Sequence, residues 1–447
     1  MKKLKLCAFM LLAVLAMLVL TACNRNGGEA GYEEGVDFRA DVPASLRMSW
    51  WGGDERHDAI IAAVRHFESE NPHITVDATG LGWDGYHTSM TVQLMAGDAP
   101  DLFSFGAGYR VTYNAFLRDF AEYMHLFPFL EERRDILETH VYMVGGRIVG
   151  VPAGIGAHVM AFSKTLFDRA GVPHPTDDMT QSDWNDMTEA VIAALGPGYF
   201  ADSGWYWGPA WSSLGEPSWG MPSSWIDFTD FETQPPRINV DWDVHRRIWS
   251  TVERHWDLGV IPRAGDDDVG FPTGNALFAS TASPRGVSAG TEMEIGLVLG
   301  PRRWDENSPI VRMAPSPGLF WGVPESTNNP LQAIFLLEFL QTDPTAVEHI
   351  GFHVGSPTNT ASLLHLQSTL EEGSYEYHQL RIFNMSMEGV DEWVAHPAVA
   401  GQPEASAAWR QTLYEFLHEV IDLETFLVRV IDEVQNAFDT FFIPLTD

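Results

Sequence analysis

The segment SWWGGDER combines residue types that bind small polar ligands: two indole rings, two glycines and three charged side chains in consecutive positions. Flat rings cover the apolar face of a ligand, while carboxylate and guanidinium groups bind its polar rim in bidentate fashion. In an extended strand Trp50 and Trp51 point to opposite faces, so one ring is expected to face a site. The alternative is that both rings belong to a core and the charges only cap a helix. The candidate binding residues of this segment are Trp50, Trp51, Gly53, Asp54, Glu55 and Arg56.

Further candidate binding residues lie in five other segments. GWDGY carries a tryptophan and an aspartate in a loop, and in DLFSFGAGY either Ser104 or Tyr109 can reach a site. Residues 200–225 hold five tryptophans without helical or strand periodicity, and so long a loop needs a function or a partner to order it. Each of these rings can instead be an ordinary core residue. The additional candidates are Trp83, Asp84, Ser104, Trp205, Trp211, Trp219, Trp321 and Trp409.

Motifs for catalysis or for metal binding do not stand out. Paired carboxylates can hydrolyse a glycosidic bond, but in a chain with 61 Asp and Glu residues no spacing singles out a pair. The segment AGDDDVG lacks the regular oxygen-ligand spacing of a calcium loop, and a solvated run of charges explains it better. We therefore expect no catalytic residue, no metal and no cofactor.

The order of predicted elements indicates an α/β fold. SLRMSWW alternates as a first strand; apolar residues then recur at helical spacing up to Phe67, with Asp54 as the predicted N-cap and Asn71-Pro72 as the stop. ITVDATG predicts a second strand, GWDGYHTSMTVQLMAGDAP a turn and a helix, and DLFSFGA a third strand. This alternation is typical of parallel α/β packing, in which ligands bind beyond the carboxyl ends of the strands. The stretch from SAAWRQ to FDTFF predicts two amphipathic helices.

The N-terminus has the features of a secretory signal. Lysines precede an uncharged, apolar run at 6–22, which is short for a membrane span. The run ends in LTAC, which resembles a bacterial lipobox and implies a lipid on Cys23. We therefore expect a signal peptide at 1–22, a polar tether at 23–44, and an extracytoplasmic protein anchored to the bacterial cell membrane. An ordinary signal peptide with a chance cysteine is the alternative.

The chain is strongly acidic, with a formal net charge of −34 at pH 7. Such a surface repels nucleic acid, so we expect no nucleic-acid partner. Cys7 lies inside the predicted signal, which leaves Cys23 as the single cysteine of the mature chain and excludes an internal disulfide. The length favours two domains or lobes, and we expect a monomer.

Five blocks of sequence, in the expected order, resemble family 1 extracellular solute-binding proteins, the group that includes maltose-binding proteins. The first block runs from SWWGGDER to PDLFSF, and the last is the pair of C-terminal helices. Between them lie GRIVGVPAGIGAHVMAFSKTLFDRAGVPHP, GNALFAS and GLFWGVPESTNNPLQAIFLLEFLQTDP. The resemblance covers most of residues 45–440, but residues 200–240 do not align and GNALFAS lacks the Ala-Met usual in the family.

This resemblance implies a periplasmic-binding-protein-like α/β fold with two lobes, each made of discontinuous chain, and a hinge between them. The lobes are expected at 45–155 plus 296–345 for the N-lobe and at 156–295 plus 346–447 for the C-lobe. The segments that cross between the lobes are expected near 152–158, 294–301 and 342–350.

The resemblance also implies binding without catalysis, and it implies that Trp409 stands at a position where the family stacks a ring on the ligand. Ligand binds in the cleft, the hinge closes, and an ABC-type permease recognises the closed form. Flat rings and planar polar groups suit a sugar or oligosaccharide, which the lipoprotein captures and delivers to the permease. The alternative is a surface-anchored glycan-degrading or glycan-holding protein with a different fold.

Overall fold

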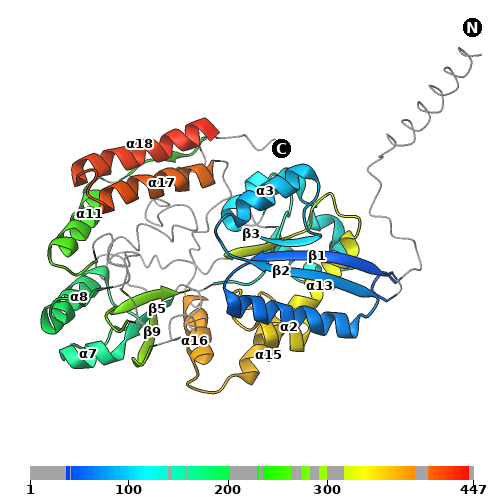
Figure 1. Ribbon diagram of the computed structural model, residues 1–447, viewed down its shortest axis with the longest axis horizontal. Helices are drawn as coiled ribbons and strands as arrows, with labels where there is room; N and C mark the ends of the chain where they lie inside the picture. The colour runs from blue at the N-terminus through cyan, green and yellow to red at the C-terminus, as the bar shows by residue number, and fades with distance from the viewer. Residues whose placement is uncertain are drawn as a thin grey trace, which may run out of the picture. The chain divides into compact units, whose positions relative to one another are not determined.

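The predicted alternation of strands and helices is present in the computed structural model (Figure 1). The structure describes residues 37–40, 42–138, 143–156, 159–201, 229–230, 233, 235–240, 242–262, 269, 273–281, 291–299, 317–387 and 401–441. Contacts divide the chain after Pro43, and every sheet lies in the unit Ala44–Asp447.

The first sheet has five strands in the order β2-β1-β3-β10-β4. Three of them follow one another closely in sequence and run parallel: β1 (Ala44–Trp51), β2 (Ile74–Leu81) and β3 (Leu102–Gly106). The other two are β10 (Leu319–Gly322), antiparallel to both of its neighbours, and β4 (Val151–Pro152). The predicted strands are confirmed, and the late strand β10 makes the sheet mixed.

Helices pack on both sides of this sheet, with α2 and α13 on one side and α3 on the other (Figure 1). The predicted first helix is α2 (Asp54–Glu70), whose buried residues include Ile60, Val64 and Phe67. Its N-cap is Gly53 rather than Asp54, so Asp54 stands in the first turn, where a carboxylate also favours the helix dipole. The other helices of this region are α3 (Tyr86–Ala96) and α13 (Pro330–Thr342), with α14 (Pro344–Ile350) packed on α2 and α13, and α15 (Thr360–Thr369) packed on α13 and α14.

Short helical turns, rather than one long helix, lie between β3 and β4 of the first sheet. Asp119 caps one of them by accepting a hydrogen bond from the amide of Ala121, and its carboxylate also accepts from the amide of Ile148. The turns are η1 (Ala107–Tyr109), α4 (Arg110–Tyr113), η2 (Asn114–Phe116), η3 (Phe120–Leu126), α5 (Pro128–Glu131) and α6 (Arg134–Leu137).

The second sheet has three antiparallel strands in the order β8-β5-β9. They are β5 (Val159–Ser163), β8 (Phe278–Thr281) and β9 (Ile295–Leu299). We expected the chain to return to the N-lobe at residue 296, but β9 pairs with β5, and the chain rejoins the first sheet at β10. A separate pair is formed by β6 (Thr229–Asp230) and β7 (Arg237–Ile238).

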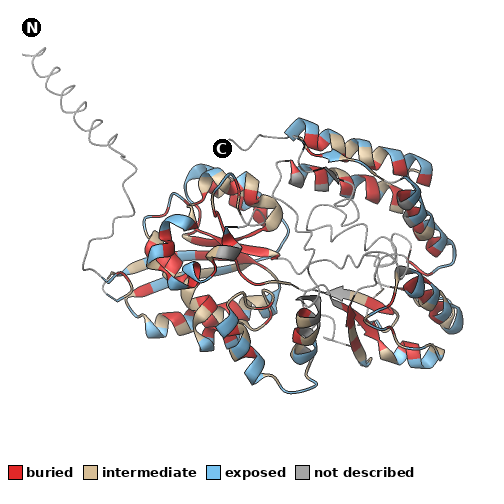
Figure 2. Cartoon of the chain, turned by 180° about the vertical axis from the view of Figure 1, so that it is seen from behind, coloured by how far each residue is buried: buried red, intermediate tan, exposed pale blue. Residues whose placement is uncertain are grey.

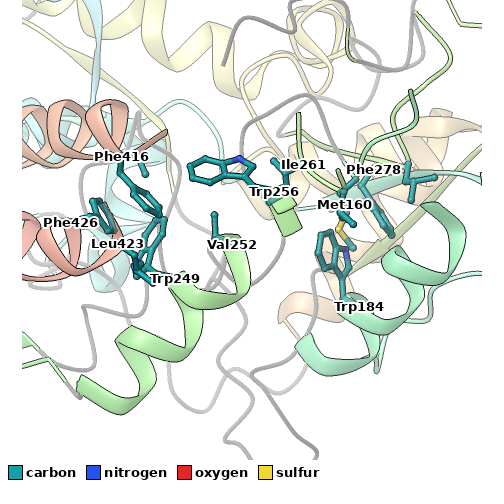
Figure 3. Close-up of a cluster of buried hydrophobic side chains, with 14 of the residues drawn as sticks. Met160, Trp184, Trp249, Val252, Trp256, Ile261, Phe278, Phe416, Leu423 and Phe426 are labelled. Carbon is teal, nitrogen blue, oxygen red and sulfur yellow. The ribbon is translucent and has the colours of Figure 1, made fainter. Parts of the chain in front are cut away.

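A hydrophobic core rich in tryptophan, which we call the second core, joins residues of this sheet to the helices beside it (Figure 3). Trp184, Trp249 and Trp409 are each at most 2 % exposed, and Figure 3 shows Trp249 beside Phe416 and Phe426. The predicted C-terminal pair is confirmed as α17 (Gln402–Leu417) and α18 (Leu423–Phe441). The remaining helices are α7 (Lys164–Ala170), α8 (Gln181–Leu195), α11 (Trp242–Asp257) and α16 (Tyr375–Met387).

Two segments that connect the regions of the two sheets touch each other at residues 154–156 and 354–356. The amide of Ile155 donates to the carbonyl of Ser356 and the amide of Ser356 to the carbonyl of Ile155, both at 2.8 Å. Glycines allow this approach: a Cβ on Gly154 would lie 2.7 Å from the carbonyl oxygen of Val354, and Gly355 has a φ of +104°. We call these residues the crossing pair.

Buried residues line the inner faces of the helices and exposed residues the outer faces, as amphipathic spacing predicts (Figure 2). Among the residues that the structure describes, no helix has the length and apolar character needed to cross a membrane.

Candidate ligand-binding site

The carboxyl ends of β1, β2 and β3 meet at one edge of the first sheet, because these strands run parallel. β1 ends at Trp51, just before the first turn of α2. β2 ends at Leu81 and leads through a short loop into α3, and β3 ends at Gly106 and leads into η1. Three loops therefore converge at one place, as the sequence predicted.

Aromatic side chains from these three loops form one group, which we call the aromatic cluster. The ring of Trp51 lies edge-on to Trp83, with centroids 5.4 Å apart, and its centroid is 5.1 Å from that of His87. Trp83 is 44 % exposed and Trp51 only 9 %, so Trp83 offers the more accessible ring to a ligand. The aromatic cluster comprises Trp51, Trp83, Tyr86, His87, Tyr109 and Tyr113.

His87 is the centre of the aromatic cluster. Its imidazole stacks on the ring of Tyr109, with centroids 3.8 Å apart and planes 13° apart. The side chain is buried, and burial lowers its pKa to about 3, so the ring is neutral at neutral pH. Nδ1 lies 3.4 Å from the hydroxyl of Tyr113, while Nε2 has no hydrogen-bond partner among the described residues. His87 thus acts as an uncharged aromatic support for Tyr109.

Tyr86 fixes the strand ends beneath the aromatic cluster. Its hydroxyl donates to the carbonyl of Ser104 at 3.0 Å and reaches the carbonyl of Ser49 at 3.2 Å. Burial raises the pKa of Tyr86, so the hydroxyl keeps the proton that these contacts need. The phenol group of Tyr86 therefore links the C-terminal parts of β1 and β3.

Carboxylates border the aromatic cluster. Asp54 and Glu55 stand at the start of α2 and Asp84 in the loop before α3, and all three are exposed, as is the predicted Gly53. Exposed carboxylates beside an exposed indole ring are the combination expected for binding the hydroxyl rim and the apolar face of one ligand.

Tyr109 also connects the aromatic cluster to a helix of the second core. The turn η1 contacts α17. Burial is the main cause that raises the pKa of Tyr109; the charge of Arg410 lowers this pKa and that of Glu404 raises it. Both charged residues belong to α17, so groups from both regions of the chain face the half-buried phenol ring.

Arg56, a predicted ligand contact, is engaged within the protein. Its Nε donates to the carbonyl of His353 at 2.8 Å and its Nη1 to the carbonyl of Trp51 at 3.1 Å. Burial lowers the pKa of Arg56. The guanidinium group therefore joins the end of β1 to the segment beside the crossing pair.

Three candidates in the strands of the first sheet are buried. Trp50, which is 0 % exposed, lies against His57 on the opposite face of β1 from Trp51. Ser104 is fully buried opposite Trp321 in the sheet. Trp321 is 3 % exposed and lines a cavity of about 30 Å³ beside the crossing pair.

Trp409 lies in the second core. Its ring centroid is 5.8 Å from that of Trp249 and 6.1 Å from that of Phe426, and the side chain is 2 % exposed. We expected this residue to stack on a ligand; in the structure its neighbour Arg410 is one of two residues of α17, with Glu404, whose charges act on Tyr109 of the aromatic cluster.

Three candidates, Trp205, Trp211 and Trp219, fall outside the described residues. His87 was missed by the sequence reasoning, because a lone histidine on a helix gives no signal that separates a core residue from a site residue. The stacking partner Tyr109 was named only as an alternative to Ser104, and the structure places Tyr109 and not Ser104 in the aromatic cluster. Among the described residues no group of His, Cys, Asp and Glu is arranged to hold a metal ion.

Solved structures share this architecture over most of the chain. A periplasmic solute-binding protein from Pectobacterium atrosepticum is 20 % identical with a TM-score of 0.71, covering 88 % of this chain and 100 % of that one. An oligogalacturonide-binding protein from Yersinia enterocolitica is 17 % identical with a TM-score of 0.70, at 88 % and 100 % coverage. An ABC substrate-binding protein from Listeria monocytogenes, solved with cycloalternan, is 14 % identical with a TM-score of 0.66, at 89 % and 100 % coverage. The chain therefore has the α/β periplasmic-binding-protein fold.

Sequence comparison finds a family model that matches part of the chain. Residues 53–243 are similar to the family model of bacterial extracellular solute-binding proteins. A binding protein of Brucella abortus is 28 % identical over 134 residues, which is 29 % of this chain and 31 % of that protein. The match thus spans about a third of the length of these curated relatives.

Proposed function

We propose that the protein is a sugar-binding receptor of an ABC importer and catalyses no reaction. The observation that carries this proposal is the aromatic cluster at the carboxyl ends of three parallel strands. Its most exposed ring, Trp83, lies beside the exposed carboxylate Asp84, and this pairing suits a ligand with an apolar face and a hydroxyl rim.

The names of structural neighbours support a saccharide ligand. The Yersinia protein was solved with saturated digalacturonic acid and the Listeria protein with cycloalternan. We infer that this chain also binds a sugar or an oligosaccharide. The candidates that carry the binding are Trp51, Trp83, Asp84, Tyr109 and Arg410, together with Asp54, Glu55 and the tryptophans of residues 200–225.

In the proposed receptor, ligand binding would close two lobes about a hinge. The N-lobe would contain the five-stranded sheet with α2, α3 and α13–α15, and the C-lobe the three-stranded sheet with the second core. Gly154 and Gly355 of the crossing pair lie where the chain passes between these regions, and glycines can absorb backbone rotation there. A ligand that contacts Tyr109 on one side and α17 on the other would favour the closed state, which an ABC permease would recognise.

We also propose that the receptor is a lipoprotein made with a signal peptide at 1–22. The LTAC segment supports lipidation of Cys23, and residues 23–44 would tether the folded part to the outer face of the cell membrane. This proposal is independent of the identity of the ligand.

A thermal-shift screen against mono-, di- and oligosaccharides tests the receptor proposal. A saccharide present at 100 times its dissociation constant adds about 2.7 kcal/mol to the free energy of unfolding. The radius of gyration from small-angle scattering should then decrease at saturation with the saccharide that was found. Binding without compaction, or release of shortened products, would favour the glycan-holding or glycan-degrading alternative.

A further inference from the structure

Arg56 makes a connection that ligand binding alone does not explain. Its guanidinium group donates to two main-chain carbonyls that are 302 positions apart in sequence (353 minus 51), those of Trp51 and His353. None of the described carboxylates forms an ion pair with Arg56. A cation that is withdrawn from water is costly unless its donors find acceptors, and here carbonyl oxygens accept from two of its three nitrogens.

The first of these carbonyls belongs to the proposed ligand loop. Trp51 ends β1 and carries a ring of the aromatic cluster. The stem of Arg56 lies directly over Gly52, where an added Cβ would be 2.6 Å from the Arg56 Cδ. Gly52 in turn donates its amide to the carbonyl of Leu81 at the end of β2. Arg56 therefore packs on the loop and bonds to it.

The second carbonyl belongs to the turn that enters the crossing pair. The amide of His353 donates to Ile350 at the end of α14, and two residues later Gly355 meets Ile155. A change of the backbone angles at Gly355 therefore moves the acceptor that Arg56 holds. A rigid, planar donor group between two carbonyls passes such a displacement on to the other one.

We propose that Arg56 is a positioning residue that couples the ligand loop at Trp51 and Gly52 to the hinge at the crossing pair. Arg56 changes the orientation of the loop when the crossing pair rotates, and it rotates the crossing pair when the loop moves. It does not contact the ligand. The inference rests on the proposed hinge, but its test needs no saccharide, so its failure and the failure of sugar binding are separate results.

The test is a double-mutant cycle read by hydrogen exchange of backbone amides in the ligand-free, full-length mature chain. Gly355→Ala perturbs the crossing pair, and Arg56→Gln removes the bridge. In the wild-type background, Gly355→Ala should speed exchange at Gly52 on the order of tenfold, the effect of losing one charge-assisted hydrogen bond. In the Arg56→Gln background, Gly355→Ala should still speed exchange at Ile155 and Ser356 but should leave the rate at Gly52 unchanged.

The matched control is Arg147→Gln. Arg147 also donates to two main-chain carbonyls, those of Asn114 and Leu117, each at 2.6 Å, but it has no contact with the crossing pair. In that background Gly355→Ala should retain its full effect on Gly52. Arg56→Lys should give an intermediate result, because an ammonium group cannot bridge both carbonyls in the planar geometry of a guanidinium group.

The proposal is overturned if Gly355→Ala changes exchange at Gly52 equally with and without Arg56, or does not change it in either background. Should Gly355→Ala fail to fold, Ile155→Ala takes its place, because it removes side-chain packing at the crossing pair without adding a Cβ at a crowded glycine. The same comparison at Gly52 then decides the matter.

Discussion

The imidazole of His87 and the phenol ring of Tyr109 stack with their centroids 3.8 Å apart and their planes 13° apart. His87 is the buried partner and Tyr109 the half-buried one, which also feels the charges of Arg410 and Glu404. The stack therefore joins the buried His87 to Tyr109, on which the charges of two residues of α17 act.

The accessible ring of the aromatic cluster should contribute to binding and not to folding. Trp83→Ala should weaken saccharide affinity by about 1–3 kcal/mol, the range for a central aromatic contact, measured by calorimetry with the saccharide found in the screen. Trp242→Ala is the matched control, since Trp242 is 49 % exposed on α11 and should leave affinity unchanged. Equal affinities of the two variants would remove Trp83 from the site.

His87 should make stability depend on pH. Burial lowers the pKa of the folded state from 6.5 to about 3, so between these values the unfolded chain binds one more proton than the folded chain. Stability should therefore fall as pH decreases from 6.5 towards 3, with a slope of up to about 1.4 kcal/mol per pH unit from this group.

His87→Phe keeps an aromatic ring beside Tyr109 and removes the titration. Urea unfolding across this pH range should therefore give a smaller slope in His87→Phe than in the wild type. His245, whose pKa burial lowers to about 4, should still contribute its own slope in the variant. An unchanged slope would show that His87 is protonated in the folded state.

Two glycines with positive φ, Gly373 and Gly355, separate the effect of backbone strain from the effect of close approach. Gly373 has a φ of +84° and open space around it, whereas a Cβ on Gly355 would lie 2.9 Å from the carbonyl carbon of Ile155. Gly373→Ala should cost about 1–2 kcal/mol of stability from the left-handed conformation alone. Gly355→Ala should cost at least about 1 kcal/mol more than Gly373→Ala, measured by urea unfolding, because the facing segment at Ile155 must move. Equal losses would argue against the close contact.

Trp409 should matter for folding. Because it packs against Trp249 and Phe426, Trp409→Ala should lower the free energy of unfolding by about 3–5 kcal/mol. Tyr414→Ala on the same helix, at a residue that is 56 % exposed, should change it by only about 0.5 kcal/mol. Thermal unfolding checks both. A stable Trp409→Ala protein that has lost saccharide binding would return Trp409 to the site.

The lipid anchor is tested by fractionation. Cys23→Ser should move the protein from the membrane to the soluble fraction, because the acyl chains are the proposed attachment. Cys7→Ser changes only the signal peptide and is the control. Membrane association that persists in Cys23→Ser would contradict lipidation.

Local sequence patterns predicted the first part of the fold, but they did not predict the pairing of strands that lie far apart in sequence. β1 to β3 and their helices follow from hydrophobic period and from stops such as Asn71-Pro72, which depend on neighbouring residues only. The insertion of β10 beside β3 and the pairing of β9 with β5 join residues far apart in sequence, and no local period encodes them.

The candidate site divides in the same way. Alternation in a strand predicted that Trp50 and Trp51 face opposite sides, but which side is buried depends on what packs there, and His57 of α2 covers Trp50. Helical spacing also puts Trp409 on the stripe of Leu413 and Phe416, which is the buried stripe of α17. The resemblance to a family, not the local pattern, suggested a ligand contact there.

The position of β10 has a consequence for the order of folding. β10 lies between β3 and β4, so β4 has no neighbour in this sheet until residues 319–322 arrive, about 170 residues later in the chain. Closing so long a loop costs entropy before any contact is gained, and proteins dominated by such distant pairings fold slowly. A chain that emerges from its N-terminus can assemble β1, β2 and β3 early, but it leaves an unpaired edge at β3 until residues 319–322 have been made. That edge, with the apolar residues Phe103 and Phe105 of β3, would need protection from aggregation until then.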